Sequence, residues 1–563
     1  MRSEVIIVAT LVCAVVAVYA GGFALYTLLD TSEATEPADD PEYGSLSFLD
    51  VSGDAGIDYE SDSDDGLTGT QAMMSNSGIY VTDVQNNGHQ DLLFVGGTEP
   101  ELYVNDGGSY SRALFPSVDG DVRAALFFDR DGDGSEDLLL LRMHAEPLFF
   151  ENRDGQFVPD SAGFDDTLAV PIGAAAADYT GNGCLDVFVI QNGDWTESSP
   201  VGQVRHSVPD GSDNGEPNVL YRGDCESFTA ASEDAGITGD RWSLATTFVD
   251  LTGNDRPDIH VANDFNRDIV YINEGDGTFE RTELGMETNR NGMSSTVADV
   301  TGNGNMDLFV TNIWFSAEME EHVDVWSFDY TGRGNNLLIN QGDGTFEPGG
   351  ETFNVTRGGW GWAATLADFS NDGTLDLVHA TRHYEFTNRA DLSESEHEEI
   401  HETYPFYRHP AVWEGLGDEF VEVSAPEVGF DVIDSRGLVA VDYNHNGQLD
   451  IGIANNAGSF SLYENTADTG NWIIVDVEGD ESVTNIGASV SVEFGDERKH
   501  RVIESNTDYL SQGERRAHVG LGAADSATIT VSWQDGPTHE FDSLDANAVY
   551  SVDPAGTVES LEP

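Results

Sequence analysis

The stretch DRDGDGSED at residues 129–137, which runs directly into LLLLR at 138–142, decides the fold of this chain. It has aspartates at its first and ninth positions, oxygen-bearing side chains at its third and fifth, and a glycine at its sixth. Calcium takes about six to eight oxygen ligands, which side chains at positions 1, 3, 5 and 9 and the carbonyl of position 7 can supply around a glycine-like turn. The pattern therefore predicts a calcium loop that leads into a β-strand.

The same nine-residue pattern occurs seven times, and both end aspartates are present in every copy. The copies are DVQNNGHQD (83–91), DRDGDGSED (129–137), DYTGNGCLD (178–186), DLTGNDRPD (250–258), DVTGNGNMD (299–307), DFSNDGTLD (368–376) and DYNHNGQLD (442–450). One copy could be an ordinary turn, but seven copies in phase predict up to seven Ca²⁺ sites. An EF-hand is excluded, because its position 12 needs a bidentate Glu and here that position falls inside an apolar run.

Every loop offers the side chains of positions 1, 3, 5 and 9 and the carbonyl of position 7. In chain order the predicted metal ligands are Asp83, Gln85, Asn87, His89, Asp91, Asp129, Asp131, Asp133, Ser135, Asp137, Asp178, Thr180, Asn182, Cys184, Asp186, Asp250, Thr252, Asn254, Arg256, Asp258, Asp299, Thr301, Asn303, Asn305, Asp307, Asp368, Ser370, Asp372, Thr374, Asp376, Asp442, Asn444, Asn446, Gln448 and Asp450.

The loops differ in charge, so we expect unequal affinities. Asp131 and Asp133 make the second loop the most anionic, whereas Gln85 makes the first the weakest. The fourth loop has Asp255 in place of glycine, and aspartate tolerates a left-handed backbone better than most residues.

Each loop lies between two strand-like segments, and a third segment with a Gly/Asp turn follows, as in DIVYINEGDGTF (268–279). Spacings between loops are 46, 49, 72, 49, 69 and 74 residues, so the shorter ones fit a four-stranded propeller blade and the longer ones carry insertions. A lone small sheet cannot bury its faces, but seven packed radially can. The sequence predicts an all-β fold with a seven-bladed β-propeller.

Ring closure is also predicted. The seventh repeat lacks a fourth strand after SFSLYENT (458–465), and the missing strand is supplied by SLSFLDVSGDAGI (45–57), which parallels SFTAASEDAGI (227–237).

The net charge of the chain limits the classes of partner that it can bind. The chain has 563 residues and a formal net charge of −79, from 103 acidic against 24 basic residues, with Lys499 as its one lysine. Such self-repulsion opposes a compact state at ordinary salt and is tolerable at molar salt, where the Debye length is about 3 Å. This favours a halophilic protein over a moderately acidic secreted one. Nucleic acid and anionic membrane surfaces are excluded as favourable partners.

The amino-terminal region predicts a membrane anchor. Residues 5–29 carry no charge and exceed the length that crosses a bilayer as a helix. Arg2 precedes this run and acidic residues follow it, which places the remaining chain outside the cell. A cleavable signal ending near Ala20 is the alternative, and the protein would then be secreted. Residues 1–30 are the expected anchor or signal and residues 31–44 an acidic tether.

The loops and the GDGTF turns resemble FG-GAP/VCBS repeats, the propeller repeats of integrin α subunits, across about residues 45–467. The carboxyl-terminal stretches NIGASVSVEF (485–494), DYLSQ (508–512), AHVGLG (517–522) and ITVSWQDG (529–536) resemble the ASPIC/UnbV domain. Alternating patterns such as TITVSW indicate a small β-sandwich-like domain over 468–555. Propeller followed by ASPIC/UnbV is the arrangement of the cartilage acidic protein family, which implies extracellular calcium binding and adhesion.

The leading functional hypothesis is a surface-anchored binding module for a protein or glycan. Long insertions at 191–217, 314–335 and 383–411 should gather at the end opposite the calcium loops, and loops on a rigid scaffold often bind ligands. They carry aromatic and histidine side chains suited to a sugar, a protein or a metal: Trp195, Trp314, Trp326, Tyr384, Tyr404, Phe406, Tyr407, His383, His397, His401 and His409.

The alternative is a polysaccharide-processing or biosynthetic enzyme. No nucleophile elbow, Walker loop, zinc signature or dinucleotide fingerprint occurs in the sequence, so no catalytic residue is predicted.

Two cysteines outside the apolar run predict a disulfide. Cys184 lies just before the second strand of the third repeat and Cys225 just after its third strand. These strands are antiparallel neighbours, so a Cα separation of about 4.4–6.8 Å is plausible. Two independent buried thiols are the alternative.

Overall fold

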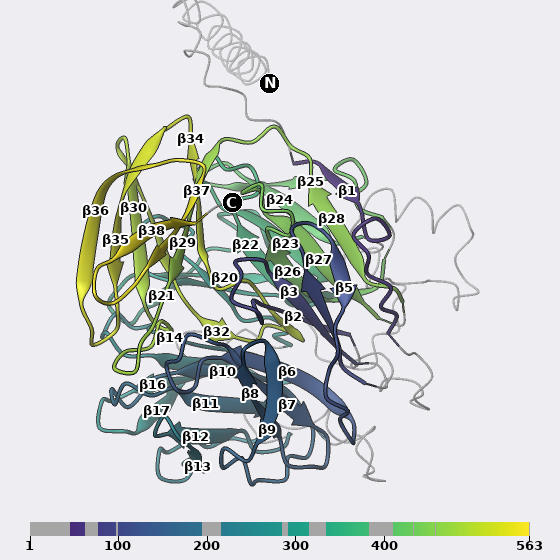
Figure 1. Ribbon diagram of the computed structural model, residues 1–563, viewed down its shortest axis with the longest axis vertical. Coiled ribbons are helices and arrows are strands. Elements are labelled where there is room, and N and C mark those ends of the chain that lie inside the picture. The colour runs from purple at the N-terminus through teal and green to yellow at the C-terminus, as the bar shows by residue number, and fades with distance from the viewer. Residues whose placement is uncertain are drawn as a thin grey trace, which may run out of the picture. The chain divides into compact units, whose positions relative to one another are not determined.

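The computed structural model describes residues 46–61, 77–96, 99–193, 215–283, 291–314, 334–381, 409–431, 433–456 and 458–561. All regular elements in these ranges are β-strands, which confirms the predicted all-β class (Figure 1). No helix within these ranges has the length and apolarity to cross a membrane. The predicted anchor (1–30) and tether (31–44) lie outside the described residues.

Seven sheets each contain one predicted loop, and each is called a blade below. Their strands are β2 (Gly78–Thr82), β3 (Asp91–Val95), β4 (Glu101–Asn105) and β5 (Tyr110–Arg112) in blade one; β6 (Val122–Phe128), β7 (Asp137–Arg142), β8 (Leu148–Arg153) and β9 (Gln156–Asp160) in blade two; β10 (Pro171–Ala177), β11 (Asp186–Gln191), β12 (Val219–Gly223) and β13 (Phe228–Ala230) in blade three; β14 (Trp242–Val249), β15 (Asp258–Asp264), β16 (Ile269–Asn273) and β17 (Phe279–Thr282) in blade four; β18 (Thr296–Ala298), β19 (Asp307–Val310), β20 (Asn336–Asn340) and β21 (Phe346–Pro348) in blade five; β22 (Gly361–Ala367), β23 (Asp376–Thr381), β24 (Ala411–Gly415) and β25 (Phe420–Val423) in blade six; and β26 (Ser435–Val441), β27 (Asp450–Asn455) and β28 (Ser461–Asn465) in blade seven.

The blades are antiparallel meanders, and their first two strands flank the loop. The second strand of every blade begins at the ninth residue of its loop, for example β7 at Asp137. Most first and second strands are buried along nearly their whole length, as in LLLLR after Asp137, whereas Thr296 and Val297 of β18 are half-buried. Continuous apolar runs of this kind suit sheets that are covered on both faces.

A strand from the amino end completes blade seven. β1 (Phe48–Asp50) pairs antiparallel with β28, with Phe48 opposite Asn465. The side chain of Phe48 is buried against Phe369 and Phe430, at ring-centroid distances of 5.6 and 5.1 Å. This is the pairing that the sequence predicts for residues 45–57.

Asparagines at the end of third strands join neighbouring blades. Each donates its side-chain N–H to a backbone carbonyl at loop position 2 of the preceding blade; the pairs are Asn105 with Tyr443, Asn152 with Val84, Asn273 with Tyr179, Asn340 with Leu251, and Asn465 with Phe369. Blades three and six have glycine at this point, and there β6 packs on β10 and β18 on β22. The contacts therefore run from blade to blade and return from blade seven to blade one, as in a propeller.

The carboxyl-terminal domain consists of two four-stranded sheets. One contains β34 (Ala517–Gly522), β29 (Asn471–Val477), β37 (Ala548–Val552) and β38 (Val558–Leu561); the other contains β31 (Glu497–Val502), β30 (Ser489–Phe494), β35 (Ser526–Ser532) and β36 (Thr538–Asp545). Val475, Val490 and Val531 are fully buried in the core that the two sheets share with blades one to three. Because β38 pairs with β37, this domain extends beyond the expected boundary at residue 555.

Residues 505–512 of the carboxyl-terminal domain, called the central segment, lie among the first strands of the blades. β32 (Ser505–Asn506) pairs with β10 (Figure 1), and β33 (Ser511–Gln512) pairs with β2. Six blades donate backbone N–H groups to this segment, from Ile79, Phe127, Ala174, Thr246, Phe248, Ser295 and Ala364. Donors from so many blades can meet one short segment only near the axis of the ring.

Candidate calcium loops and the domain interface

The first aspartate of each loop organises the turn that follows it. In all seven loops one of its carboxylate oxygens accepts the backbone N–H of position 6, at 2.6–2.9 Å. Position 6 has a positive φ in every copy, including 61° at Asp255, as the sequence predicts for a residue that replaces glycine there. Position 4 is also left-handed, and is occupied by glycine, asparagine or, in loop seven, His445 (φ 60°). This second requirement was not recognised in the sequence.

The ninth aspartate ties the loop to the end of the third strand. One oxygen accepts the N–H of loop position 2 at 3.0–3.3 Å. The other accepts a backbone N–H from the third strand at 2.7–2.9 Å, for example that of Asn152 in blade two. All seven of these aspartates are buried. Their invariance is thus explained by backbone architecture as well as by any bound ion.

Burial shifts the acidity of these carboxyl groups. It raises the pKa of Asp137 to about 7 and that of Asp186 to about 8, although the N–H donors oppose the shift. It raises the pKa of Asp129 to about 6, and that of Asp368 and Asp442 to about 7. Burial makes a carboxylate unfavourable in its charged form, and a nearby cation stabilises that form.

Loop two brings its acidic side chains together. Ligand atoms of Asp129, Asp131 and Asp137 all lie within 4.8 Å of one another, and no other three His, Cys, Asp or Glu residues do so in the described part of the chain. In loop one the predicted ligands form contacts with other side chains. The Asn87 side chain donates an N–H to the Gln85 side chain, and Nδ1 of His89 lies 2.5 Å from Nε2 of His445. In every loop the position-5 side chain accepts the N–H of position 7.

The loop face of the propeller is the docking surface of the carboxyl-terminal domain. Gly520 donates its N–H to Asp368 at 3.0 Å, Gln534 its side-chain N–H to the Asp178 carbonyl at 2.9 Å, and His518 Nε2 to the Gly447 carbonyl at 3.0 Å. These contacts reach the loops of blades six, three and seven. The sequence offered no sign of this interface.

Arginines of the carboxyl-terminal domain lie close to several loop carboxylates. The Arg516 guanidinium lowers the pKa of Asp83 and Asp442 against the larger effect of burial, and Arg501 does the same for Asp368. Arg516 also forms an ion pair with Glu514, and both side chains are 6% exposed. Loops one, six and seven therefore have a positive charge of the carboxyl-terminal domain nearby. Loop two has Arg130 of its own sequence beside Asp131, and Arg515 of the carboxyl-terminal domain forms an ion pair with Glu136 and interacts with Asp129.

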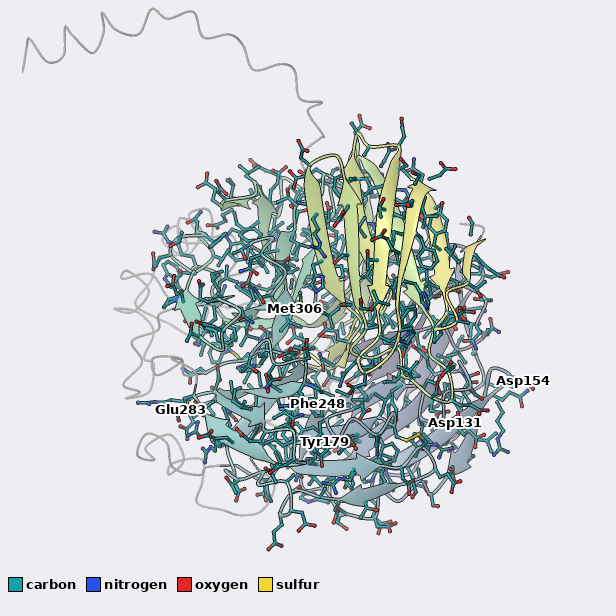
Figure 2. The ribbon with its side chains drawn as sticks, turned by 90° about the vertical axis from the view of Figure 1, so that its left-hand side faces the viewer. Asp131, Asp154, Tyr179, Phe248, Glu283 and Met306 are labelled. Carbon is teal, nitrogen blue, oxygen red and sulfur yellow. A yellow bond between two sulfur atoms is a disulfide. The ribbon has the colours of Figure 1, made fainter. Side chains whose placement is uncertain are left out.

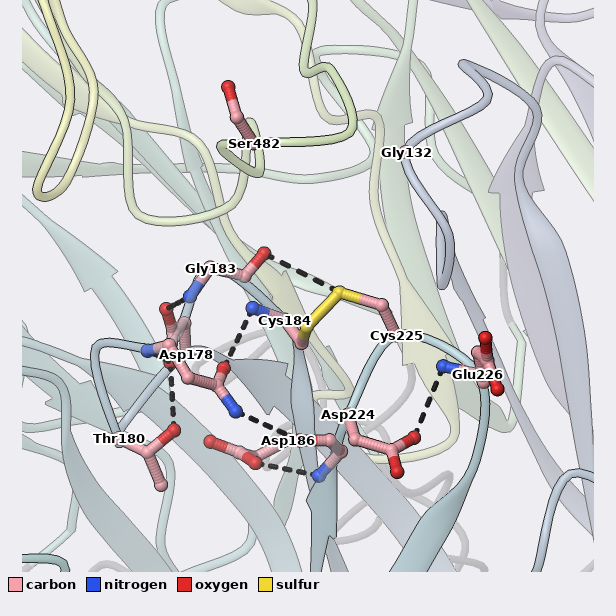
Figure 3. Close-up of a disulfide and its surroundings, with 12 residues drawn as sticks. Gly132, Asp178, Thr180, Gly183, Cys184, Asp186, Asp224, Cys225, Glu226 and Ser482 are labelled. Carbon is pink, nitrogen blue, oxygen red and sulfur yellow. Dashed lines mark hydrogen bonds between the residues drawn. A yellow bond between two sulfur atoms is a disulfide. The ribbon is translucent and has the colours of Figure 1, made fainter.

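Cys184 and Cys225 are joined by a disulfide, with a Cα–Cα distance of 5.0 Å (Figure 3). This is the pair for which the sequence predicts a bond. It connects position 7 of loop three to the turn after β12, where Cys225 has a φ of 66°. Loop three is thus fixed covalently to its own third strand.

The predicted ligand-binding insertions lie largely outside the described residues. This applies to Trp195, Trp326, Tyr384, Tyr404, Phe406, Tyr407, His383, His397 and His401. Two members are described: Trp314 lies 5.7 Å from the Arg357 guanidinium, and His409 Nδ1 lies 2.9 Å from the Asp431 carbonyl.

Comparisons with known proteins agree with the repeats and the terminal domain. Residues 250–310 and 321–379 match the FG-GAP-like repeat, and residues 480–559 match the ASPIC and UnbV family. Cartilage acidic protein 1 of Mus musculus is 23% identical over 507 residues, which cover 82% of this chain and 71% of that protein.

Two solved structures are similar at lower levels. A lectin of Agrocybe aegerita that recognises non-reducing terminal N-acetylglucosamine has 16% identity and a TM-score of 0.39, over 68% of this chain and 87% of its own. The extracellular domain of a hybrid two component system of B. thetaiotaomicron has 10% identity and a TM-score of 0.37, over 84% of this chain and 53% of its own. The family matches confirm the resemblance seen in the sequence: the chain carries FG-GAP-like repeats and an ASPIC and UnbV domain, and Cartilage acidic protein 1 is its distant homologue.

Proposed function

We propose that this chain is an extracellular, cell-surface binding module for a protein or glycan, built on a propeller that calcium stabilises. The observation that carries the calcium site is the convergence of Asp129, Asp131 and Asp137 within 4.8 Å. Two of these carboxyl groups have a pKa raised by burial to about 6 and 7, so a divalent cation would bind them against proton competition. An all-oxygen ligand set favours calcium over softer metals.

An extracellular location is supported by the disulfide, because such bonds persist in oxidising compartments. The apolar run at residues 5–29 would attach the protein to a membrane. A binding role suits the scaffold. The central segment occupies the axis of the ring, and two domains packed on each other provide a rigid base for exposed loops.

Calcium binding is tested by calorimetric titration and thermal unfolding of the full chain at a fixed high salt concentration. Removal of calcium with a chelator should lower the Tm, since a ligand that binds only the folded state stabilises it. Asp131→Asn should remove one calcium per chain, whereas Asp154→Asn, at an exposed turn of the same blade (Figure 2), should remove none. An unchanged melting curve after verified calcium removal would rule the calcium proposal out.

The binding role is tested separately. The purified chain should retain cell-envelope glycans or proteins in a pull-down, and a matched column of the acidic tether sequence alone should not. A pull-down that retains neither class contradicts the binding role while leaving the calcium result intact.

A further inference from the structure

A cleft of about 590 Å³ lies between blades four and five and the carboxyl-terminal domain. Its size is within the range of about 300–1,000 Å³ typical of small-ligand sites, which favour domain interfaces. The propeller side is formed by loop four, with Asp255 and Arg256, and by Asn305 of loop five. The opposite side is formed by Ser489 and residues 532–535. Figure 2 labels Met306 beside the lower ends of the strands of the carboxyl-terminal domain and Phe248 below them, and both residues line the cleft.

The apolar residues of the cleft are already covered by protein. Phe248 is 1% exposed, Met306 5% and Trp533 4%, and the indole N–H of Trp533 donates to the Glu478 carbonyl at 2.8 Å. These side chains line the cleft but are buried, so they offer little apolar surface to a ligand. A lipid or an aromatic compound would therefore gain little by entering.

The walls present donors and acceptors side by side. Arg256 is exposed and supplies donors, and its guanidinium forms no ion pair with any residue of the described ranges. Ser489 and Ser532 are opposite residues of adjacent strands, and the Ser532 hydroxyl accepts a hydrogen bond from the Thr538 hydroxyl at 3.0 Å. The side-chain N–H groups of Asn305 and Gln534 are used within the protein, at 2.9 Å each, so their amide oxygens remain as acceptors.

The charge of the cleft selects against anions. The lining includes three carboxylates, those of Asp250, Asp255 and Asp535, and one guanidinium, that of Arg256. Both oxygens of Asp250 already accept backbone N–H groups of loop four. Burial lowers the pKa of His500, which favours its neutral form. Phosphate, sulfate and uronate groups would meet net repulsion here.

We propose that this interdomain cleft binds a neutral carbohydrate unit. Each sugar hydroxyl both donates and accepts a hydrogen bond, so vicinal hydroxyls complement walls where carboxylate and amide oxygens alternate with serine hydroxyls and a guanidinium. This inference rests on the proposed binding function and assigns its glycan ligand to one site. The bound sugar would contact both domains, so it would also resist their separation.

The test uses two variants of the full chain that differ only in position along one strand. Ser532→Tyr places a large side chain in the cleft. Thr528→Tyr is the control, since it lies on the same face of β35, opposite Glu493 and outside the cleft. Binding is measured by saturation-transfer NMR and calorimetry with maltohexaose, chitohexaose and mannohexaose as neutral probes and hexagalacturonate as the anionic probe.

At least one neutral hexasaccharide should bind the natural chain and raise its Tm, and hexagalacturonate should not bind. Ser532→Tyr should weaken the neutral interaction by at least about tenfold, which is 1.4 kcal/mol, while Thr528→Tyr stays within about twofold. Absence of binding to all neutral probes, a preference for hexagalacturonate, or equal binding by both variants would each overturn the assignment. A pull-down that still retains an envelope partner in Ser532→Tyr would then show that the binding function stands through another surface.

Discussion

Tyr509, at the tip of the central segment, packs on Trp362 of blade six with ring centroids 4.6 Å apart. Both side chains are almost fully buried, although 147 positions separate them and they come from different domains. Arg436 of blade seven lies 4.7 Å above the same indole ring. The carboxyl-terminal domain therefore supplies part of the core of the propeller.

Tyr509→Ala should destabilise the whole chain by about 3–5 kcal/mol, because it leaves a cavity where two domains meet. Tyr509→Phe, which keeps the ring, should cost much less. Urea unfolding followed by tryptophan fluorescence measures both. If Tyr509→Ala unfolds at the same urea concentration as the natural protein, the central segment is not part of the core.

Phe48→Ala should destabilise the ring closure by about 3 kcal/mol or more, because Phe48 is buried between Phe369 and Phe430. Leu49→Ala in the same strand is the matched control, since Leu49 is 57% exposed. Thermal unfolding and resistance to proteolysis should both separate the two variants. Equal behaviour would argue against a structural role for β1.

Gly447→Ala should weaken the docking of the carboxyl-terminal domain. A Cβ at Gly447 would overlap the indole ring of Trp472, and the φ of 77° adds backbone strain. Gly417→Ala, with a φ of 84° and nothing near the added atom, carries the strain without the overlap. Protease cleavage between the domains should become faster in Gly447→Ala than in Gly417→Ala. Identical cleavage rates for the two variants would contradict the contact between Gly447 and Trp472.

Loss of the disulfide should cost about 2–4 kcal/mol, since the bond closes a long loop in the unfolded chain. The double variant Cys184→Ser, Cys225→Ser and the reduced natural protein should melt at the same lowered temperature. A reductant should have no effect on the double variant. Two alkylated thiols in the unreduced natural protein, seen by mass spectrometry, would refute the bond.

His379 should make stability fall in acid. Its Nδ1–H donates to the Ala380 carbonyl at 3.0 Å, Nε2 accepts from the Asn335 amide at 3.2 Å, and burial lowers its pKa to about 4. The unfolded chain has the ordinary value of about 6.5 and binds the proton first, so this stabilisation is complete above pH 6.5 and is lost as the pH falls towards 4. The loss is up to about 3 kcal/mol.

The matched variant is His379→Gln, which does not titrate. Its unfolding free energy, measured in urea at fixed high salt from pH 7.5 to pH 4, should change less steeply than that of the natural protein. Parallel curves for the two proteins would show that His379 is not held neutral in the folded state.

The sequence predicts the features that nearby residues determine. The loop at 129–137 specifies its own turn through Asp129 and Gly134, so the loop and the strand after it follow from spacing alone. The same spacing predicts the glycine-like conformation of Asp255, which is at the equivalent position of the fourth loop. The central segment is different. SNTDYLSQ has no strand periodicity, and its backbone partners are supplied by six blades. Ile79, which donates to the Leu510 carbonyl, lies 431 positions away along the chain. A pattern of local residues carries no information about such partners.

Loop two shows which features of the candidate site the sequence can predict and which it cannot. Its anionic composition is visible in the sequence, and it is the loop whose acidic side chains converge. The arginines beside loops one, six and seven, and Arg515 beside loop two, come from the carboxyl-terminal domain, so the positive charge around these loops depends on docking. Spacing within a loop could not reveal it.

The position of the central segment also determines when the ring can be completed during synthesis of the chain. Residues 46–465 can form all the blades, but their innermost strands obtain their last hydrogen-bond partners only when residues 505–512 arrive. A chain made from its amino end, at about 5–20 residues per second, must hold an incomplete ring until its carboxyl-terminal domain emerges. Truncation anywhere before residue 512 should therefore leave a ring with an open axis, and such a product is a substrate for quality-control proteases rather than a smaller working protein.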